Sequence, residues 1–322
     1  MANDIPPQPI AGQIRALTPA FDSLIARDAT IELLAEGFTW TEGPVWIADG
    51  GYLLFSDVPE NRIYRWSQAD GVSVFLDPSG YDGPDPAAFR EPGANGLIPG
   101  PGNSILVADH GNRAIARLDL TTRQKTFLAT HYRGRRFNSP NDLAQARDGT
   151  IYFTDPPYGL AGLDGSPLKE LPFNGVYKID PNGAVALLDD SISFPNGIIL
   201  SPDERTLYVA CSDPDRAIWM AYALDSRGDV AGRRIFADVT DSVDPVQRPG
   251  LPDGMTIDAA GNLFATAPGG IIVFAPDGTM IGQISVGTAI ANCTFGEDGR
   301  TLFIAAHHRL ARIRTLTRAP NT

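Results

Sequence analysis

A short motif recurs six times along the chain and constrains its fold more than any other feature. Each copy begins with a side chain that carries an oxygen atom, followed usually by glycine or another small turn residue and then by a short apolar run. These six residues, called the ring residues below, are Glu42, Asn95, Asn141, Asn196, Asp253 and Asn292. Successive copies lie between 39 residues (253 to 292) and 57 residues (196 to 253) apart. Such a period is typical of repeat architectures in which each repeat is one supersecondary unit.

A strand-like run ends 14 or 15 residues after each ring residue. These runs are rich in β-branched and aromatic residues, and most follow a turn such as Asp148-Gly149 or Asp298-Gly299. They end at Asp57, Asp109, Asp155, Cys211, Ala267 and Ala306. A third apolar run and a fainter fourth one follow in the repeats. Four short strands per unit, six units and no helical periodicity predict an all-β, six-bladed β-propeller. A pair of β-sandwiches or an α/β domain would not explain the constant spacing between each ring residue and the end of the strand that follows it.

The chain ends predict how the circle of blades closes. The last repeat shows only three strands, so we expect the run Ala29–Leu34 to supply its fourth strand. Residues 1–28 then form an N-terminal extension with a short helix near Pro19–Arg27, and residues 29–322 form one propeller domain. The insertion Pro156–Asn174 should lie on the same face as the ring residues, where loops often determine substrate specificity.

The ring residues have a distinct chemistry if they meet. The first strand of each propeller blade lines the central channel, so six side-chain oxygens should converge near the axis. Two carboxylates and four carboxamides are hard oxygen ligands, which suit Ca²⁺ better than Zn²⁺, Mn²⁺ or Mg²⁺, although these ions could enter an open oxygen site. Asn-Gly and Asp-Gly are also ordinary turn sequences. Six of them in phase, with no apolar replacement, favour the cation site.

Composition excludes some classes of partner. The formal net charge of −12 argues against nucleic acid, because phosphate binding needs a basic surface. It is compatible with a neutral small-molecule substrate and a bound cation, and ordinary solubility charge explains it equally well. No run approaches the roughly 20 apolar residues of a membrane span. We expect a monomer or homodimer that binds neither nucleic acid nor membrane.

Cysteine content and the N-terminus bear weakly on location. Cys211 and Cys293 are the two cysteines, too few for a disulfide framework or a thiolate metal cluster. The first 17 residues lack the pattern of a secretory signal peptide. Free cysteines favour a cytoplasmic location, and a periplasmic one stays open if a signal peptide was removed.

Five stretches together resemble the gluconolactonase, senescence-marker-protein and regucalcin family, with diisopropyl-fluorophosphatase as a more distant relative. They are residues 41–46 (TEGPVW), 138–142 (NSPND), 152–159 (YFTDPPYG), 194–197 (FPNG) and 252–255 (PDGM). The resemblance implies a divalent metal, usually calcium, held by a Glu, an Asn and an Asp, with a further Asn that ligates it or contacts substrate. By motif these are Glu42, Asn196, Asp253 and Asn141.

The resemblance also implies hydrolysis of a sugar lactone such as glucono-1,5-lactone to the aldonic acid, by a carboxylic ester hydrolase of the gluconolactonase type. The metal would polarise the carbonyl group and Asp253 would activate water. His110, just after the second strand of its repeat, is a further catalytic candidate, and an orienting role suits it equally. We expect substrate contacts from Asn95, Asn112, Tyr158 and Asn292.

One position departs from the family pattern. Regucalcin-like members have Arg two residues before the substrate-contacting Asn, whereas this chain has Ser139. The preferred lactone therefore stays open. The nearby basic run at 133–136 could meet an anionic substrate or form a solvated loop. Two rival functions also remain: an esterase or phosphotriesterase that uses the same ring, and a metal-stabilised binding propeller without catalysis, which the unbroken donor set disfavours.

Overall fold

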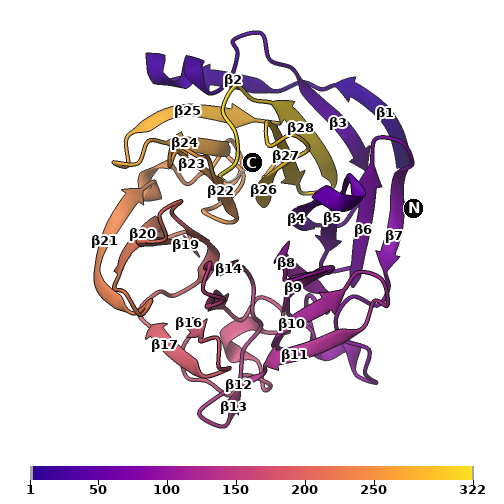
Figure 1. Cartoon of the computed structure of the whole chain (residues 1–322), viewed down its shortest axis with the longest axis vertical. Helices are drawn as coiled ribbons and strands as arrows, with labels where there is room; N and C mark the ends of the chain where they lie inside the picture. The colour runs from indigo at the N-terminus through magenta and orange to yellow at the C-terminus, as the bar shows by residue number, and fades with distance from the viewer. Residues whose placement is uncertain (1–2, 321–322) are drawn as a thin grey trace.

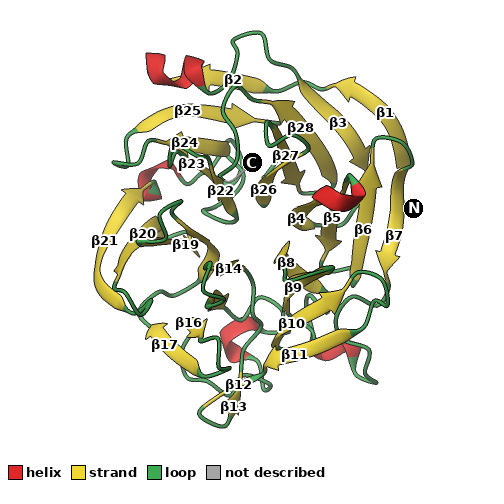
Figure 2. Ribbon diagram, in the orientation of Figure 1, coloured by secondary structure: helices red, strands yellow, loops and turns green. Residues whose placement is uncertain are grey.

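The computed structural model describes residues 3–320 as six antiparallel sheets arranged around a central axis (Figure 1). In each sheet the strands follow one another from the axis to the rim. This arrangement confirms the six-bladed propeller that the sequence repeat predicts. In Figure 2 helices are short red segments, and within residues 3–320 all of them are 3-10 helices. No helix in that range has the length and apolar character that crossing a membrane would require.

The strands of the first three blades follow the chain in order. The first blade contains β4 (Thr41–Ile47), β5 (Tyr52–Asp57), β6 (Arg62–Ser67) and β7 (Gly71–Leu76). The second contains β8 (Ala94–Pro99), β9 (Ser104–Asp109), β10 (Ala114–Asp119) and β11 (Lys125–Ala129). The third contains β14 (Leu143–Gln145), β15 (Ile151–Asp155), β16 (Gly175–Ile179) and β17 (Val185–Asp189). A small hairpin, β12 (His131–Tyr132) and β13 (Arg135–Arg136), separates the second and third blades.

The last three blades include strands from both chain ends. The fourth contains β18 (Pro195–Leu200), β19 (Thr206–Asp213), β20 (Arg216–Leu224) and β21 (Val230–Asp238). The fifth contains β22 (Met255–Ile257), β23 (Leu263–Ala267), β24 (Gly270–Phe274), β25 (Met280–Ser285) and, at its edge, β2 (Gln13–Ala16). The sixth contains β26 (Asn292–Gly296), β27 (Thr301–Ala306), β28 (Arg309–Arg314), β3 (Ile31–Glu36) and β1 (Asn3–Pro9). The 3-10 helices are Pro19–Ser23, Ala48–Gly50, Pro86–Ala88, Leu163–Gly165 and Thr240–Ser242.

An N-terminal strand closes the last blade, as the sequence predicts. Strand β3 pairs antiparallel with β28, and its observed range, Ile31–Glu36, lies two residues beyond the predicted one. Arg312 Nε reinforces this pairing with a 2.7 Å hydrogen bond to Glu32 Oε2. The edge strands β1 and β2 add to the sixth and fifth blades from the outside, and the helix expected near Pro19–Arg27 is the 3-10 helix Pro19–Ser23.

The hydrophobic core is divided among the blade interfaces. Among the described residues, six buried apolar clusters occur, one between each pair of neighbouring blades. In the interface that completes the circle, Leu34 and Phe303 of the sixth blade share a cluster with Phe55 and Trp66 of the first. Removing β3 would therefore take Leu34 out of this interface and also expose a sheet edge.

The glycine after a ring residue marks a close approach between blades. A Cβ atom at Gly43 would lie 2.1 Å from the backbone oxygen of Asn95, and one at Gly197 would lie 2.2 Å from that of Asp253. In both cases the obstacle is the next blade's ring residue. Gly43 also has a φ of +46°, which disfavours a side chain. In the third blade Asp142 takes this position, and its carboxylate accepts a 3.3 Å hydrogen bond from the Ile198 backbone N–H of the next blade.

Two truncations test this account of closure. We expect a variant without residues 1–17 to fold and to melt several degrees lower, because it loses only the outer strands β1 and β2. A variant without residues 1–36 should fail to fold, because it lacks the closing strand and the side chains that this strand adds to two blade interfaces. Thermal unfolding followed by circular dichroism measures both. A cooperative transition near the wild-type temperature for the longer deletion would contradict the role assigned to β3.

Candidate functional site

A cavity of about 490 Å³ lies at the face where the first strands begin. Five of the six ring residues line it: Glu42, Asn95, Asn141, Asn196 and Asp253. The remaining walls come from Ser212, near the end of β19, and from loops: Trp40, Arg90, Glu91, Tyr158, Pro214, Val243, Pro245, Pro249, Gly250, Leu251, Ala289 and Ile290. The repeat phase therefore brings residues as far apart as 42 and 253 to one site.

Three ring asparagines are oriented through their amide nitrogens. Asn196 Nδ2 donates to Ser212 Oγ at 2.8 Å. Asn95 Nδ2 and Asn141 Nδ2 lie 3.2 and 3.4 Å from the same atom, His110 Nε2. Within residues 3–320 no hydrogen bond reaches the Oδ1 atoms of these three side chains. Three carboxamide oxygens are therefore left for whatever occupies the cavity.

Asn292 is a ring residue with a different orientation. Its Oδ1 accepts from the Cys293 backbone N–H at 2.8 Å, and its Nδ2 donates to Glu42 Oε2 at 3.1 Å. The Gly43 backbone N–H donates to that same Glu42 oxygen at 2.9 Å. Asn292 is not among the walls of the cavity. Asn292 therefore holds the carboxylate of Glu42 from outside the cavity and offers no side-chain oxygen to the cavity.

Ionisation of the carboxyl groups in and beside the ring is unfavourable when no cation is near. Burial raises the pKa of Glu42 to about 8, although the bonds from Gly43 and Asn292 oppose the rise. Burial also raises the pKa of Asp253 well above its usual value, and the neighbouring Glu42 adds to the rise. Burial raises the pKa of Asp142 to about 7. A cation among these groups would offset both desolvation and mutual repulsion.

The donor set fits a hard cation. Among the described residues, no group of three or more His, Cys, Asp or Glu side chains is placed to hold a metal ion. A site at the ring would therefore combine the carboxylates of Glu42 and Asp253 with the carboxamide oxygens of Asn141 and Asn196. Neutral and charged oxygens in such a mixture are the ligands that calcium prefers.

The other predicted site residues divide into two groups. Tyr158 lines the cavity, and its ring stacks on Phe194 with centroids 5.8 Å apart. Burial raises the pKa of Tyr158, so its phenol stays protonated as a hydrogen-bond donor. His110 is fully buried and lies behind the ring, not at the cavity wall. Asn112 is also absent from the wall, because its Nδ2 donates to Gly80 O and Asp109 Oδ2, both at 2.9 Å.

Two opposed walls were not predicted from the sequence. Arg90 and Glu91, at the end of loop 77–93, give one wall its charge, and Arg90 is the only cationic side chain among the described lining residues. The segment 239–251 gives the other wall its apolar character through Val243, Pro249 and Leu251. Neither segment carries the repeat period, so spacing gave no indication of these contacts.

Hydroxyl groups near the ends of some second strands bind the backbone at or beside the ring residue of the next blade. Ser56 Oγ donates to Asn95 O at 2.8 Å, and Thr154 Oγ1 donates to Asn196 O at 2.7 Å. Thr266 Oγ1 likewise reaches the Ala291 carbonyl, just before Asn292, at 3.3 Å. A Ser or Thr that recurs one residue before the end of the second strand could have revealed these contacts in the sequence.

Ser139, where the chain departs from the family pattern, is a buried anchor for the insertion. Its Oγ donates to Pro156 O at 2.6 Å and accepts from the Gly159 backbone N–H at 2.9 Å. The basic run at 133–136 lies in and beside the β12–β13 hairpin and does not line the cavity. Within it, Arg136 Nη2 donates to Asn112 O at 2.6 Å.

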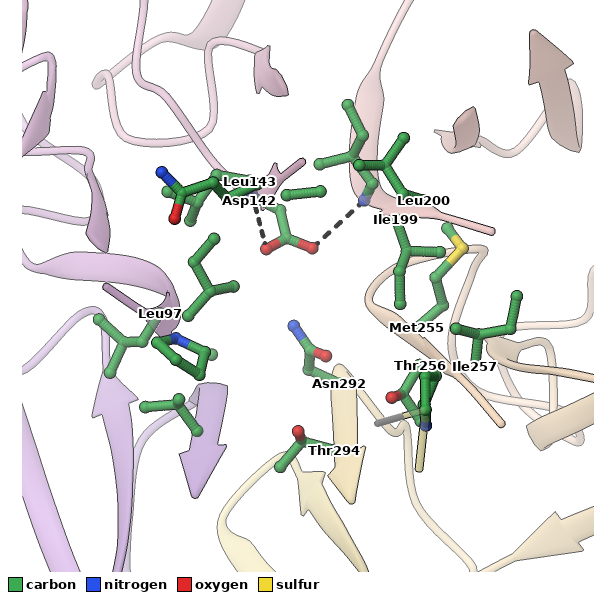
Figure 3. Close-up of a pocket in the computed structure, with 18 of the residues that line it drawn as sticks. Leu97, Asp142, Leu143, Ile199, Leu200, Met255, Thr256, Ile257, Asn292 and Thr294 are labelled. Atoms are coloured by element: carbon green, nitrogen blue, oxygen red, sulfur yellow. Dashed lines mark hydrogen bonds between the residues drawn. The ribbon is translucent and has the colours of Figure 1, made fainter. Parts of the chain in front are cut away.

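A second cavity, of about 430 Å³, is lined by residues that follow the ring residues in the first strands (Figure 3). Figure 3 shows the Asp142 carboxylate there with its two hydrogen bonds, from the backbone N–H groups of Leu143 and Ile198. Leu97, Ile199, Leu200, Met255 and Ile257 make much of the surroundings apolar. Asn292 lines this cavity, so the ring residues lie between two separate cavities.

The raised pKa of Glu42 predicts a pH dependence of stability in a chelating buffer. The pKa of Glu42 is about 8 in the fold and ordinarily 4.5, so between these values the folded state keeps a proton that the unfolded state has released. Raising the pH therefore favours unfolding. We expect the melting temperature to fall between about pH 5 and pH 8, and Glu42→Gln to reduce the fall. A wild-type melting temperature that is constant or rises over this range would contradict the expectation.

Comparison with known proteins agrees with the geometry. A 312-residue alignment with a gluconolactonase from Zymomonas mobilis is 49 % identical and covers 95 % of this chain and 87 % of that protein. A pentonolactonase from Haloferax volcanii is 25 % identical over 79 % of this chain and 77 % of its own length. The solved structure of a gluconolactonase from Xanthomonas campestris superposes with a TM-score of 0.82, at 32 % identity, over 97 % of this chain and 98 % of that one. Residues 40–308 match the family model for the SMP-30/gluconolactonase/LRE-like region, and the chain belongs to this family.

Proposed function

We propose that this protein hydrolyses a sugar lactone, such as glucono-1,5-lactone, to the aldonic acid, with a calcium ion bound at the ring. The observation that carries the proposal is the set of three carboxamide oxygens, of Asn95, Asn141 and Asn196, that accept no hydrogen bond within residues 3–320. They lie at a cavity of about 490 Å³, a size typical of small-molecule sites. The gluconolactonase and pentonolactonase among the relatives support a sugar lactone as the substrate class.

The ion would be held by Glu42, Asn141, Asn196 and Asp253. When bound, it supplies a Lewis acid that polarises the lactone carbonyl group. The three carboxylates in and beside the ring, whose pKa values burial raises, support a site for positive charge. The hard oxygen set favours Ca²⁺ over Zn²⁺ and Mn²⁺, and Mg²⁺ usually keeps several waters.

Asp253 is the candidate general base. A water oxygen forms the new bond to the carbonyl carbon, and Asp253 accepts the proton that this water gives up. The bond between that carbon and the lactone's own ring oxygen then breaks, and this oxygen takes the proton back from Asp253 to become a hydroxyl group.

The remaining walls suit the two kinds of surface on a sugar lactone. Asn95, Tyr158, Arg90 and Glu91 offer donors and acceptors for hydroxyl groups. The apolar wall and Trp40 suit the C–H faces of the sugar ring. His110 supports the ring from outside the cavity, which favours its orienting role over direct catalysis.

A metal-dependence assay tests the proposed activity. We expect purified protein to open glucono-1,5-lactone faster than the spontaneous reaction, to lose that rate in a chelator and to regain it with Ca²⁺. Acid release in a pH-stat measures all three rates, and parallel reconstitution with Mg²⁺, Mn²⁺ and Zn²⁺ ranks the ions. The absence of metal-dependent hydrolysis on any sugar lactone would refute the proposal.

Replacing Asp253 tests its role separately. Asp253→Asn keeps the shape of the side chain and removes its capacity as a base, so we expect kcat to fall by about 100-fold or more. Asp203→Asn, at an exposed carboxylate on a surface turn, is the matched control and should keep the wild-type rate. Calcium binding by calorimetry separates lost basicity from lost metal. Wild-type turnover by Asp253→Asn would remove this residue from the mechanism.

A further inference from the structure

The side chain of His110 has hydrogen-bond donors near one ring nitrogen and a carboxylate, which can only accept, near the other. Its Nε2 faces the amide nitrogens of Asn95 and Asn141, at 3.2 and 3.4 Å. Its Nδ1 lies 3.3 Å from Glu91 Oε2, a contact that is not aligned as a hydrogen bond, and no hydrogen-bond partner of Nδ1 is present within residues 3–320. A neutral imidazole has one N–H donor and one bare nitrogen acceptor. Two donors on one side and a carboxylate on the other therefore match the tautomer with hydrogen on Nδ1.

The tautomer determines what the ring offers to the cavity. With hydrogen on Nδ1, the bare Nε2 accepts from both amides, and the Oδ1 atoms of Asn95 and Asn141 are left for the cavity. With hydrogen on Nε2, an asparagine would have to turn its oxygen toward His110 and withdraw it from the cavity. A buried donor without a partner is destabilising, so each tautomer is compatible with only one of the two arrangements.

Glu91 is held in place from two directions. The backbone N–H groups of Arg90 and Glu91 both donate to Gly159 O, at 3.0 and 3.3 Å, which joins loop 77–93 to the insertion 156–174. A Cβ atom on Gly159 would lie 2.9 Å from the Cβ of His110, so the insertion packs directly against the imidazole. Arg90 Nη2 lies 3.2 Å from Glu91 Oε1, which leaves Oε2 for the histidine.

We propose that Glu91 is a positioning residue that acts through His110 on two ring asparagines. Its carboxylate selects the Nδ1–H tautomer of His110, and the bare Nε2 then turns the oxygens of Asn95 and Asn141 toward the cavity. The inference rests on the proposed cation site, because Asn141 is one of its four ligands. Groups of this kind behind a metal ligand commonly change metal affinity about 10- to 100-fold.

A pair of Glu91 variants separates the acceptor from its charge. Glu91→Gln removes the negative charge and keeps an oxygen that can accept from Nδ1–H, whereas Glu91→Leu removes both. Calorimetric titration with Ca²⁺ should show Glu91→Gln within a few-fold of the wild-type dissociation constant and Glu91→Leu weaker by about 10- to 100-fold. Equal weakening in both variants would overturn the proposal, because charge alone would then explain the effect. Asp82→Leu, at an exposed carboxylate in the same loop, should match wild type.

The tautomer can be measured without metal or turnover. Nitrogen-15 NMR of histidine-labelled protein at about pH 8 distinguishes the two neutral tautomers, and His110→Gln assigns the resonance. We expect hydrogen on Nδ1 in wild type and in Glu91→Gln, and a shift toward the other tautomer in Glu91→Leu. Hydrogen on Nε2 in wild type would overturn the inference. If wild type binds no divalent ion, the proposed cation site fails, and the tautomers of the two variants still decide the role of Glu91.

Discussion

The candidate site depends on the fact that the propeller has no core at its axis. Its apolar clusters lie between blades, so packing alone cannot hold polar side chains at the centre. The neighbouring blade does this, through hydroxyl groups such as those of Ser56 and Thr154 that bind the backbone of the next ring residue. Glycines such as Gly43 and Gly197 permit the short distance that these bonds need. The ring is therefore a property of adjacent pairs of blades.

The repeat period predicted the backbone correctly and the side-chain directions only in part. A constant offset between motifs places each ring residue at the start of a first strand, and from this the fold, its closure by an N-terminal strand and most of the cavity floor followed. Asn95 and Asn292 have equivalent positions, yet one offers an oxygen to the cavity and the other is engaged by Cys293 and Glu42. Spacing specifies where a Cα lies, whereas the local donors decide how a carboxamide turns.

Loops were the part of the site that the sequence could not supply. Arg90, Glu91 and the apolar wall near Leu251 belong to segments without a period, and their positions depend on contacts between loops, such as the one at Gly159. Asn112 shows the opposite case, since a residue on a suitable loop is engaged by Asp109 and Gly80 and stays outside the cavity. Placement on the correct face is thus necessary for a site residue and not sufficient.

The closing strand has a consequence for biosynthesis. Arg312 binds Glu32 across 280 positions of the chain, and Asn292 binds Glu42 across 250. Contacts between such distant segments raise contact order and slow folding. During translation, five blades can assemble while the sixth still lacks its C-terminal strands. Glu42 therefore has no contact with Asn292 until almost the last segment has been synthesised. The site is therefore completed at the end of synthesis, when both ends of the chain meet in one sheet.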